Sequence, residues 1–461
     1  MVFFETKIPR ELIKNWKQYT KDWVELKRPC EWPELSKNQK CRVNACAVST
    51  DDIDPGPKEN ISLTRICIDQ TIDQSSLREE KKEEEKDNPH VEKSSHTVSI
   101  VKKYKKDGVT LNPGLYWYKE NNIENSPISE YEAAICRFYR FLSPETVSKC
   151  WAVTSVRKTK DGYDEIVRVG VLSKGIPNFK NLIQDPLTQA DIEKYAAELA
   201  KALVLSYIMQ EDDLHRGNMS KKGKRVDFDG SLWPLLSLIK GKRWFNSHDD
   251  HGFKVFEHDL RELPSIAMAQ PAYWPSLYSH YSTGLNKNCF SKKETSIFQS
   301  LKDFPLISYI VKKELLRFIL TDRSNYKKMA SLDIREDTWF ELTLDEIDEK
   351  TKRKKKIWRP AIEVFADHMQ DRINEFRKVL IYFPEFRVFV KDNAEADGVT
   401  VLDEILREFD QHNKRLKGKP YAAEMTADLD LIQEKFRILV EDVKKDKTEI
   451  EEKILRRKFK C

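Results

Sequence analysis

QEDDLHRGNMSKKGKRVDFDGSL, residues 210–232, is the most informative stretch of this 461-residue chain. It contains a D-x-H-x-x-N pattern at 213–218 and a D-F-D-G pattern at 227–230. Before it lies DIEKYAAELAKALVLSYIM (191–209), whose apolar residues recur at the spacing of a buried helix. The residues RVDF (225–228) are expected to form a short strand. A polar loop between a buried helix and a strand would gather several carboxylate and amide groups in one place.

These residue types suit the transfer of a phosphoryl group. That reaction requires an acceptor hydroxyl held in line and cations that neutralise the phosphate oxygens. Asp213 could orient the acceptor and take its proton, and His215 is expected to support this catalytic loop. Asn218 and Asp227 offer the oxygen ligands that Mg²⁺ or Mn²⁺ prefers, and Asp229 is the alternative to Asp227. A surface turn rich in Asp, His and Asn is the structural alternative, but the two patterns in this order favour a phosphotransferase site.

The two patterns resemble the atypical branch of the protein kinase superfamily. In that branch, HipA-type and phosphatidylinositol kinases have a D-x-H-x-x-N catalytic loop, which DLHRGN (213–218) matches. VDFDG (226–230) stands where the family has its metal-binding Asp-Phe-Gly, with the glycine one position late. Whether Asp227 or Asp229 binds the metal therefore stays open. The resemblance implies an α+β, two-lobed protein-kinase-like fold that binds ATP with Mg²⁺ or Mn²⁺.

The resemblance also implies a lysine on a strand, which holds the α and β phosphates of ATP, and a helix glutamate that pairs with this lysine. The sequence LYWYKE places Lys119 on a strand of alternating character, upstream of a helix expected at 130–142. Glu132 is the first choice for the partner, and Glu130 is the reserve. However, Ser129 and Glu132 also form a capping-box pattern, in which Glu132 would bind only an amide of its own helix.

The phosphate loop and the adenine-binding hinge are less distinct. KKYKKDGVT (102–110) would be the phosphate loop, but only Gly108 lies in it, and glycine is scarce in the chain at 14 of 461 residues. Backbone amides or the lysines of this turn would replace the missing glycines. The hinge is expected after the strand EIVRVGVL (165–172), around Val171 to Lys174, where backbone groups would bind adenine.

Clusters of basic residues could bind a phosphate-rich ligand by Coulomb attraction, although a solvated surface is the ordinary explanation. They are Lys221, Lys222, Lys224 and Arg225; Lys240, Lys242 and Arg243; and the run KRKKK at 352–356. No aromatic residues alternate with these charges, so nucleic acid is not an expected partner. With the atypical loop and the glycine-poor turn, the clusters resemble Legionella-type secreted effector kinases, some of which depend on host inositol hexakisphosphate.

This closer resemblance implies an inositol polyphosphate activator, action inside a host cell and a C-terminal module that contacts phosphoinositide membranes. A protein serine or threonine is the first expected acceptor, and a phosphoinositide headgroup is the second. A pseudokinase or polyphosphate-sensing scaffold stays open as an alternative, and so does the transfer of AMP in place of phosphate.

Composition excludes several protein classes. The chain has 81 basic and 76 acidic residues, is 34% charged, and has no apolar run of about 18 residues that would span a bilayer. Its start shows no secretory cleavage pattern. Eight cysteines without a C-x-x-C pair disfavour a zinc knuckle or a disulfide framework and favour a reducing compartment, hence the cytoplasm of the producing cell.

Composition shifts along the chain predict three parts. Residues 1–96 are expected to form a helical extension with a polar insert. The kinase-like core would cover 97–350, with a small lobe at 97–173 and a large lobe at 174–350. Residues 351–461 would form a helical module, because apolar stripes recur near 402–409, 432–443 and 450–455. These stripes are expected to pack as a bundle, and a membrane or partner surface is the alternative.

Overall fold

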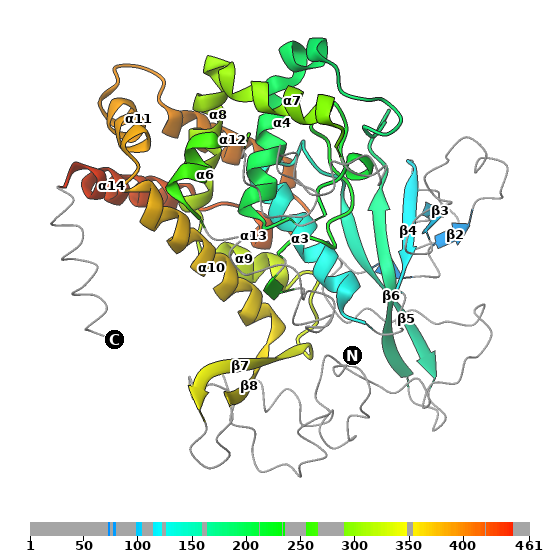
Figure 1. Ribbon diagram of the computed structural model, residues 1–461. Coiled ribbons are helices and arrows are strands. Elements are labelled where there is room, and N and C mark those ends of the chain that lie inside the picture. The colour runs from blue at the N-terminus through cyan, green and yellow to red at the C-terminus, as the bar shows by residue number, and fades with distance from the viewer. Residues whose placement is uncertain are drawn as a thin grey trace.

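The fold is mixed helix and sheet, in agreement with the expected α+β class. In the computed structural model a sheet lies on one side, a helical body on the other, and helix α3 between them (Figure 1). The residues that the structure describes are 72–73, 77–79, 98–103, 114–121, 126–158, 164–211, 213–232, 234–235, 255–265, 290–347, 354–419 and 421–445. Several predictions lie outside them, namely those for residues 1–50, Gly108, Lys240, Lys242, Arg243 and 450–455.

The main sheet has the strand order β1-β5-β6-β4-β3-β2, and β7 and β8 form a separate pair. The strands are β1 (Ile72–Asp73), β2 (Leu77–Glu79), β3 (Val98–Lys103), β4 (Tyr116–Glu120), β5 (Cys150–Lys158), β6 (Asp164–Lys174), β7 (Trp339–Ile347) and β8 (Lys354–Pro360). The longer helices are α3 (Ile128–Leu142), α4 (Gln189–Ile208), α8 (Pro305–Ile319), α10 (Ala361–Leu380), α11 (Pro384–Glu395), α12 (Val401–Leu416) and α14 (Leu429–Lys444). Shorter ones are α6 (Glu257–Glu262), α7 (Lys292–Gln299), α9 (Arg323–Ala330) and α13 (Ala422–Met425).

Strand β4 occupies the middle of the sheet, which determines where Lys119 lies. Lys119 is paired in register with Val98 of β3 and with Val171 of β6, and both neighbours run antiparallel to β4. A central strand has hydrogen-bonding partners on both sides, so its backbone is held more firmly than that of an edge strand. The consecutive strands β3 and β4, and likewise β5 and β6, pair antiparallel with each other.

Three boundaries differ from the sequence-based expectation. The polar insert contributes two short strands: β1 pairs with β5, and β2 pairs with β3. The outer strands of a sheet have unpaired backbone N–H and C=O groups, which can form hydrogen bonds with a further strand. Strand β6 continues to Lys174, so Val171 is a buried strand residue, and the connection to α4 begins only at Gly175. The predicted boundary at 350/351 falls between β7 and β8, which pair with each other and include part of the KRKKK run.

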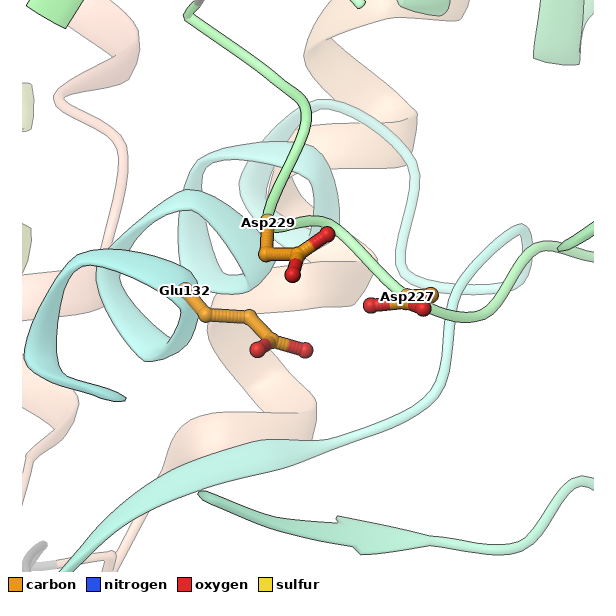
Figure 2. Close-up of side chains that lie close together, drawn as sticks. All are labelled: Glu132, Asp227 and Asp229. Carbon is orange, nitrogen blue, oxygen red and sulfur yellow. The ribbon is translucent and has the colours of Figure 1, made fainter. Parts of the chain in front are cut away.

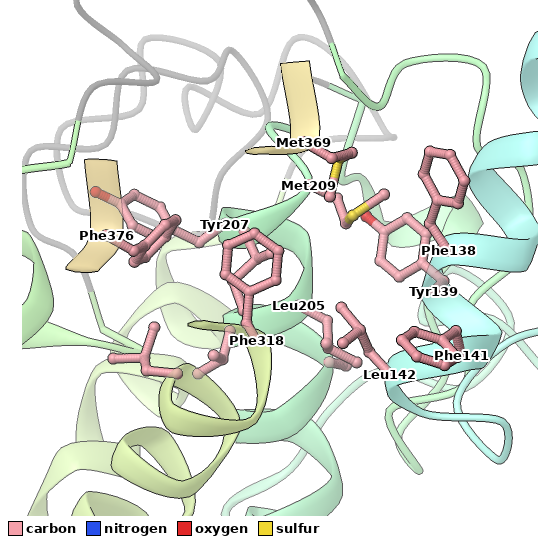
Figure 3. Packing of buried hydrophobic residues seen from close by; sticks show 14 of the residues in the cluster. Phe138, Tyr139, Phe141, Leu142, Leu205, Tyr207, Met209, Phe318, Met369 and Phe376 are labelled. Carbon is pink, nitrogen blue, oxygen red and sulfur yellow. The ribbon is translucent and has the colours of Figure 1, made fainter. Parts of the chain in front are cut away.

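One hydrophobic core joins α3 to the helices that follow it, including those of the C-terminal third. Figure 3 shows side chains of α3, α4, α8 and α10 packed together. Helices α12 and α14 contribute Ile405, Phe409, Phe436 and Leu439 to the same cluster. The predicted apolar stripes of these two helices therefore pack into the common core. Within the described part of the chain, no helix combines the length and the apolar character needed to cross a bilayer.

Two buried histidines lead us to predict that the free energy of unfolding falls in acid. Burial and the positive charge of Arg372 lower the pKa of His368 to about 4, and burial and Arg140 do the same for His412. Between pH 6.5 and pH 4 the unfolded chain binds protons on these rings and the native chain does not, so the free energy of unfolding falls as the pH falls. Each histidine contributes about 1.4 kcal/mol per pH unit in that window.

The variant His412→Asn tests this prediction by urea unfolding at pH 7, 6 and 5. Asparagine removes the titrating ring but retains a side-chain N–H near the backbone of Met425. We expect the variant to lose about 1 kcal/mol less than the wild type per pH unit. The matched control is Gln411→Asn, at the adjacent exposed position, which removes no titrating group and should follow the wild type. Equal pH dependence of His412→Asn and the wild type would contradict the assignment.

Candidate active site

The Lys119 ammonium is surrounded by three carboxylates from distant parts of the chain. Its Nζ lies 3.2 Å from Oε2 of Glu132, 2.8 Å from Oδ1 of Asp227 and 2.9 Å from Oδ2 of Asp229. Figure 2 shows the three carboxylates turned toward a common space between α3 and the segment that carries the two aspartates. The predicted lysine, its glutamate and both candidate metal ligands therefore meet at one point.

The charges of this cluster do not balance. Burial alone would lower the pKa of Lys119, but the charges of Asp227, Asp229 and Glu132 raise it well above its ordinary value. Burial, together with Asp227 and Asp229, raises the pKa of Glu132 to about 7 against the opposing effect of Lys119. One ammonium thus faces three acidic groups, and the excess of negative charge favours the binding of another cation.

The same three carboxylates fit a divalent metal ion. Glu132, Asp227 and Asp229 each have an oxygen within 4.8 Å of the oxygens of the other two. Carboxylate oxygens are the ligands that Mg²⁺ and Mn²⁺ take in proteins, commonly two at a time together with phosphate oxygens. Both aspartates contact Lys119 and belong to the same cluster, so the carboxylates of Asp227 and Asp229 can reach one ion together.

Glu130 and Glu132 have different environments, although both lie in the first turns of α3. Helix α3 begins at Ile128 without a side-chain cap, so Glu132 serves Lys119 and not the helix end that the capping-box pattern suggested. Glu130 faces away from Lys119. Its carboxylate lies 2.7 Å from Nε of Arg168 and accepts a hydrogen bond of 3.0 Å from the Thr338 hydroxyl. Glu130 therefore anchors α3, and Glu132 is the member of the pair that reaches the site.

The D-x-H-x-x-N loop follows directly after α4 and folds back on itself. The Asn218 side-chain amide donates to the carbonyl of Asp213 at 3.2 Å, which leaves Oδ1 as the atom through which Asn218 would bind a cation. The backbone N–H of Val226 donates to the carbonyl of Asn218 at 3.1 Å. This bond joins the loop to the residue immediately before Asp227. The loop and the carboxylate cluster are thus adjacent parts of one site.

His215 supports the loop and is not a proton carrier at neutral pH. Its Nδ1 accepts the backbone N–H of Gly217 at 2.9 Å, so the ring proton is on Nε2, which lies 3.7 Å from Oδ1 of Asp213. Burial lowers the pKa of His215 to about 4, against the opposing charges of Asp227 and Asp229. The neutral ring therefore caps the short turn at 216–218.

The segment that carries the two aspartates is a turn and not the predicted strand. Of residues 225–229, all of them described, only Arg225 takes part in isolated bridges, and Asp227 has φ of +62°, a left-handed conformation that ends any extended run. Phe228 is fully buried against Tyr139 of α3. The buried Phe228 fixes this turn against α3, so that the aspartates on either side of it both reach Lys119.

The basic residues after Asn218 do not form a free phosphate-binding cluster. Arg225 is fully buried in an ion pair with Glu211, which contradicts its assignment as a surface ligand. Lys221 lies 2.8 Å from Asp185 and 2.9 Å from Asp191, and Lys224 donates to a backbone carbonyl. Lys222 is exposed near the ring of Tyr195. The sequence shows that these basic residues are close together in the chain. It does not show that Lys221 and Arg225 already form ion pairs with acidic residues of the protein.

Sequence reasoning did not identify Glu211, which contacts the backbone of Asp213. Its position at the end of a buried helix, two residues before Asp213, is the signal that could have marked it. Across the described residues, the structure brings together Lys119, Glu132, Asp227 and Asp229, and places the loop from Asp213 to Asn218 beside them. No protein-family model and no curated protein matches this chain.

Opposite effects of two substitutions on Mn²⁺ affinity test the carboxylate cluster. Asp227→Asn removes a charge and an oxygen ligand, so we expect Mn²⁺ binding to weaken about tenfold or more. Lys119→Met removes the ammonium that competes for the same carboxylates, so Mn²⁺ should bind more tightly. Calorimetry or electron paramagnetic resonance measures both affinities without nucleotide. The control is Glu257→Gln, which removes an exposed carboxylate on α6.

Unchanged Mn²⁺ affinity in Asp227→Asn would contradict a metal site at this cluster. So would weaker binding in Lys119→Met, because the ammonium would then support the ion and not compete with it. Glu257→Gln is expected to match the wild type within error.

Proposed function

We propose that the protein is an ATP-dependent phosphotransferase of the atypical protein kinase type, with a two-lobed kinase-like fold. The observation that carries this proposal is the contact of Lys119 with a helix glutamate and with the aspartates that follow the D-x-H-x-x-N loop. These contacts join residues 13, 108 and 110 positions apart in the chain. Such a convergence supplies a cation for phosphate oxygens next to carboxylates for a divalent metal ion, which is what phosphoryl transfer requires.

We assign each residue a role on the basis of its contacts. Lys119, held by Glu132, would contact the α and β phosphates of ATP. Asp227 and Asp229, together with Oδ1 of Asn218, would hold Mg²⁺ or Mn²⁺, which neutralises phosphate charge when it is bound. Lys119 now contacts both aspartates, so nucleotide binding would exchange some of these contacts for phosphate oxygens.

The transfer step uses the carboxylate of Asp213, whose side chain is 34% exposed and so accessible to an acceptor. A bond forms between the acceptor hydroxyl oxygen and the γ phosphorus. The bond between the γ phosphorus and the oxygen that bridges it to the β phosphorus breaks, and ADP leaves. The hydroxyl proton passes to the carboxylate of Asp213, beside the ring of His215, whose lowered pKa keeps that ring neutral.

We propose a protein serine or threonine as the acceptor, and a phosphoinositide headgroup as the second choice. Both come from the resemblance of the loop to atypical kinases. An inositol polyphosphate activator, action in a host cell and membrane contact through the C-terminal helices belong to the same proposal. Because Lys221, Lys224 and Arg225 are engaged within the protein, Lys222 is the exposed member of the first basic cluster that would contact such an activator.

ATP labelled separately at the α and γ positions tests the proposal. The full chain is incubated with Mg²⁺ or Mn²⁺, with and without inositol hexakisphosphate, and with a mixed protein substrate or phosphoinositide vesicles. We expect γ label in the acceptor and a loss of about a hundredfold or more in Asp213→Asn, which lacks the proton acceptor. The control Asp410→Asn removes a surface carboxylate of α12 and should leave the rate unchanged.

The outcomes separate the alternatives. Incorporation of α label alone would show AMP transfer and contradict the phosphotransferase. Nucleotide binding without incorporation under any of these conditions would show a scaffold. The acceptor that takes up γ label, protein or lipid, decides between the two substrate classes.

A further inference from the structure

Glu211 is a buried carboxylate at the junction of three parts of the candidate site. It follows α4, two residues before Asp213, and its side chain has no exposed surface. Oε1 accepts the backbone N–H of Asp213 at 3.1 Å. Oε2 accepts the hydroxyl of Ser231, and it lies 3.2 Å from Nη2 of Arg225 and 3.4 Å from the hydroxyl of Tyr139 on α3.

These contacts connect the segments that supply the acceptor carboxylate, the metal ligands and the lysine partner. Asp213 lies on the catalytic loop, and Ser231 lies two residues after Asp229. Tyr139 belongs to α3, the helix that carries Glu132. A single carboxylate therefore touches the loop that receives the acceptor, the end of the metal-binding turn and the helix that holds Lys119.

Close packing makes this arrangement specific. A Cβ atom at Gly230 would lie 2.5 Å from Cβ of Asp213 and 2.9 Å from Oε1 of Glu211. The chain after Asp229 therefore passes directly against the loop, with no room for a side chain between them. At such a distance a small displacement of Glu211 moves Asp213 and the Asp229 turn relative to each other.

Arg225 neutralises Glu211 and fixes its orientation. Its side chain is also fully buried, donates to the hydroxyl of Ser206 on α4 and lies over the rings of Tyr139 and Phe228. A buried carboxylate without a partner would lose its charge or destabilise the fold, so the pair is needed to keep Glu211 an acceptor. Because both side chains are buried, the pair acts through its neighbours and not through contact with substrate.

We propose that Glu211, neutralised by Arg225, is a positioning residue that holds the Asp213 carboxylate in register with Asp227 and Asp229. The inference rests on the proposed phosphotransferase activity. Glu211 contacts Asp213 directly and reaches the metal-binding turn and α3 only through Ser231 and Tyr139, so its removal should lower kcat with little change in the KM for ATP. A displacement of about 1 Å of a reacting group can cost on the order of a hundredfold in rate.

Two double variants separate positioning from a general structural role. Glu211→Met/Arg225→Met removes both charges together, so that no buried charge is left without a partner, and it also removes the acceptor for the Asp213 amide. Glu211→Gln/Arg225→Met likewise lacks the charges but keeps a side-chain oxygen for that amide. We expect kcat to fall about a hundredfold in the first variant, with KM for ATP within twofold of the wild type, and to recover most of this loss in the second.

Ser231→Ala is a milder change that tests the same link if the first double variant does not fold. It removes only the hydroxyl that donates to Glu211, and kcat should fall several-fold at constant KM for ATP. The matched control is Arg377→Met/Asp442→Met, a partly buried ion pair between α10 and α14 whose side chains are 32% and 16% exposed. This control is expected to lower thermal stability without changing kcat.

The results distinguish failure of this inference from failure of the proposed function. A wild type that transfers no γ phosphate contradicts the function itself. An active wild type with an unaffected kcat in Glu211→Met/Arg225→Met or in Ser231→Ala contradicts the positioning role alone. Equal loss of kcat in both Glu211 double variants would also contradict it, because the oxygen that contacts Asp213 would then have no effect.

Discussion

The structure of the site depends on one buried cation, the ammonium of Lys119, shared among three carboxylates. Without it, Glu132, Asp227 and Asp229 would repel one another within a space of a few ångströms, because their charges are only partly exposed to water. With it, one negative charge is neutralised and the excess remains available for a second cation. The attraction between Lys119 and the carboxylates holds the strand, helix and turn together. The same carboxylates would bind a metal ion, and the same ammonium would bind a triphosphate.

Helix α3 transmits this constraint to the rest of the molecule. At the site, Glu132 of this helix pairs with Lys119. The helix also makes buried contacts elsewhere: Arg137 pairs with Asp333, and Glu130 binds Arg168 and Thr338. The segment at 333–338 leads into β7, so α3 contacts both the site and the part of the chain that precedes the C-terminal helices. A substitution in that segment would therefore act on Lys119 through α3.

Local sequence patterns predict the strand of Lys119 and the helices α3 and α4. They do not predict features that depend on tertiary contacts. The alternation around Lys119 and the periodicity of α3 and α4 indicated elements that the structure contains. The pattern at 129–132 is compatible with both a helix cap and a lysine partner, and only the fold distinguishes them. Sequence spacing places Arg225 in a surface cluster, because spacing rules do not detect a partner such as Glu211, 14 positions away. The left-handed turn at Asp227 has no comparable sequence signal.

A crystal structure with Mn²⁺ and a non-hydrolysable ATP analogue tests the central claim most directly. The account predicts anomalous density for manganese at the carboxylates of Asp227 and Asp229, and Nζ of Lys119 within about 3 Å of an α or β phosphate oxygen. The contact between Lys119 and Glu132 should persist. A nucleotide bound elsewhere, with Lys119 still on all three carboxylates and no manganese among them, would contradict the account.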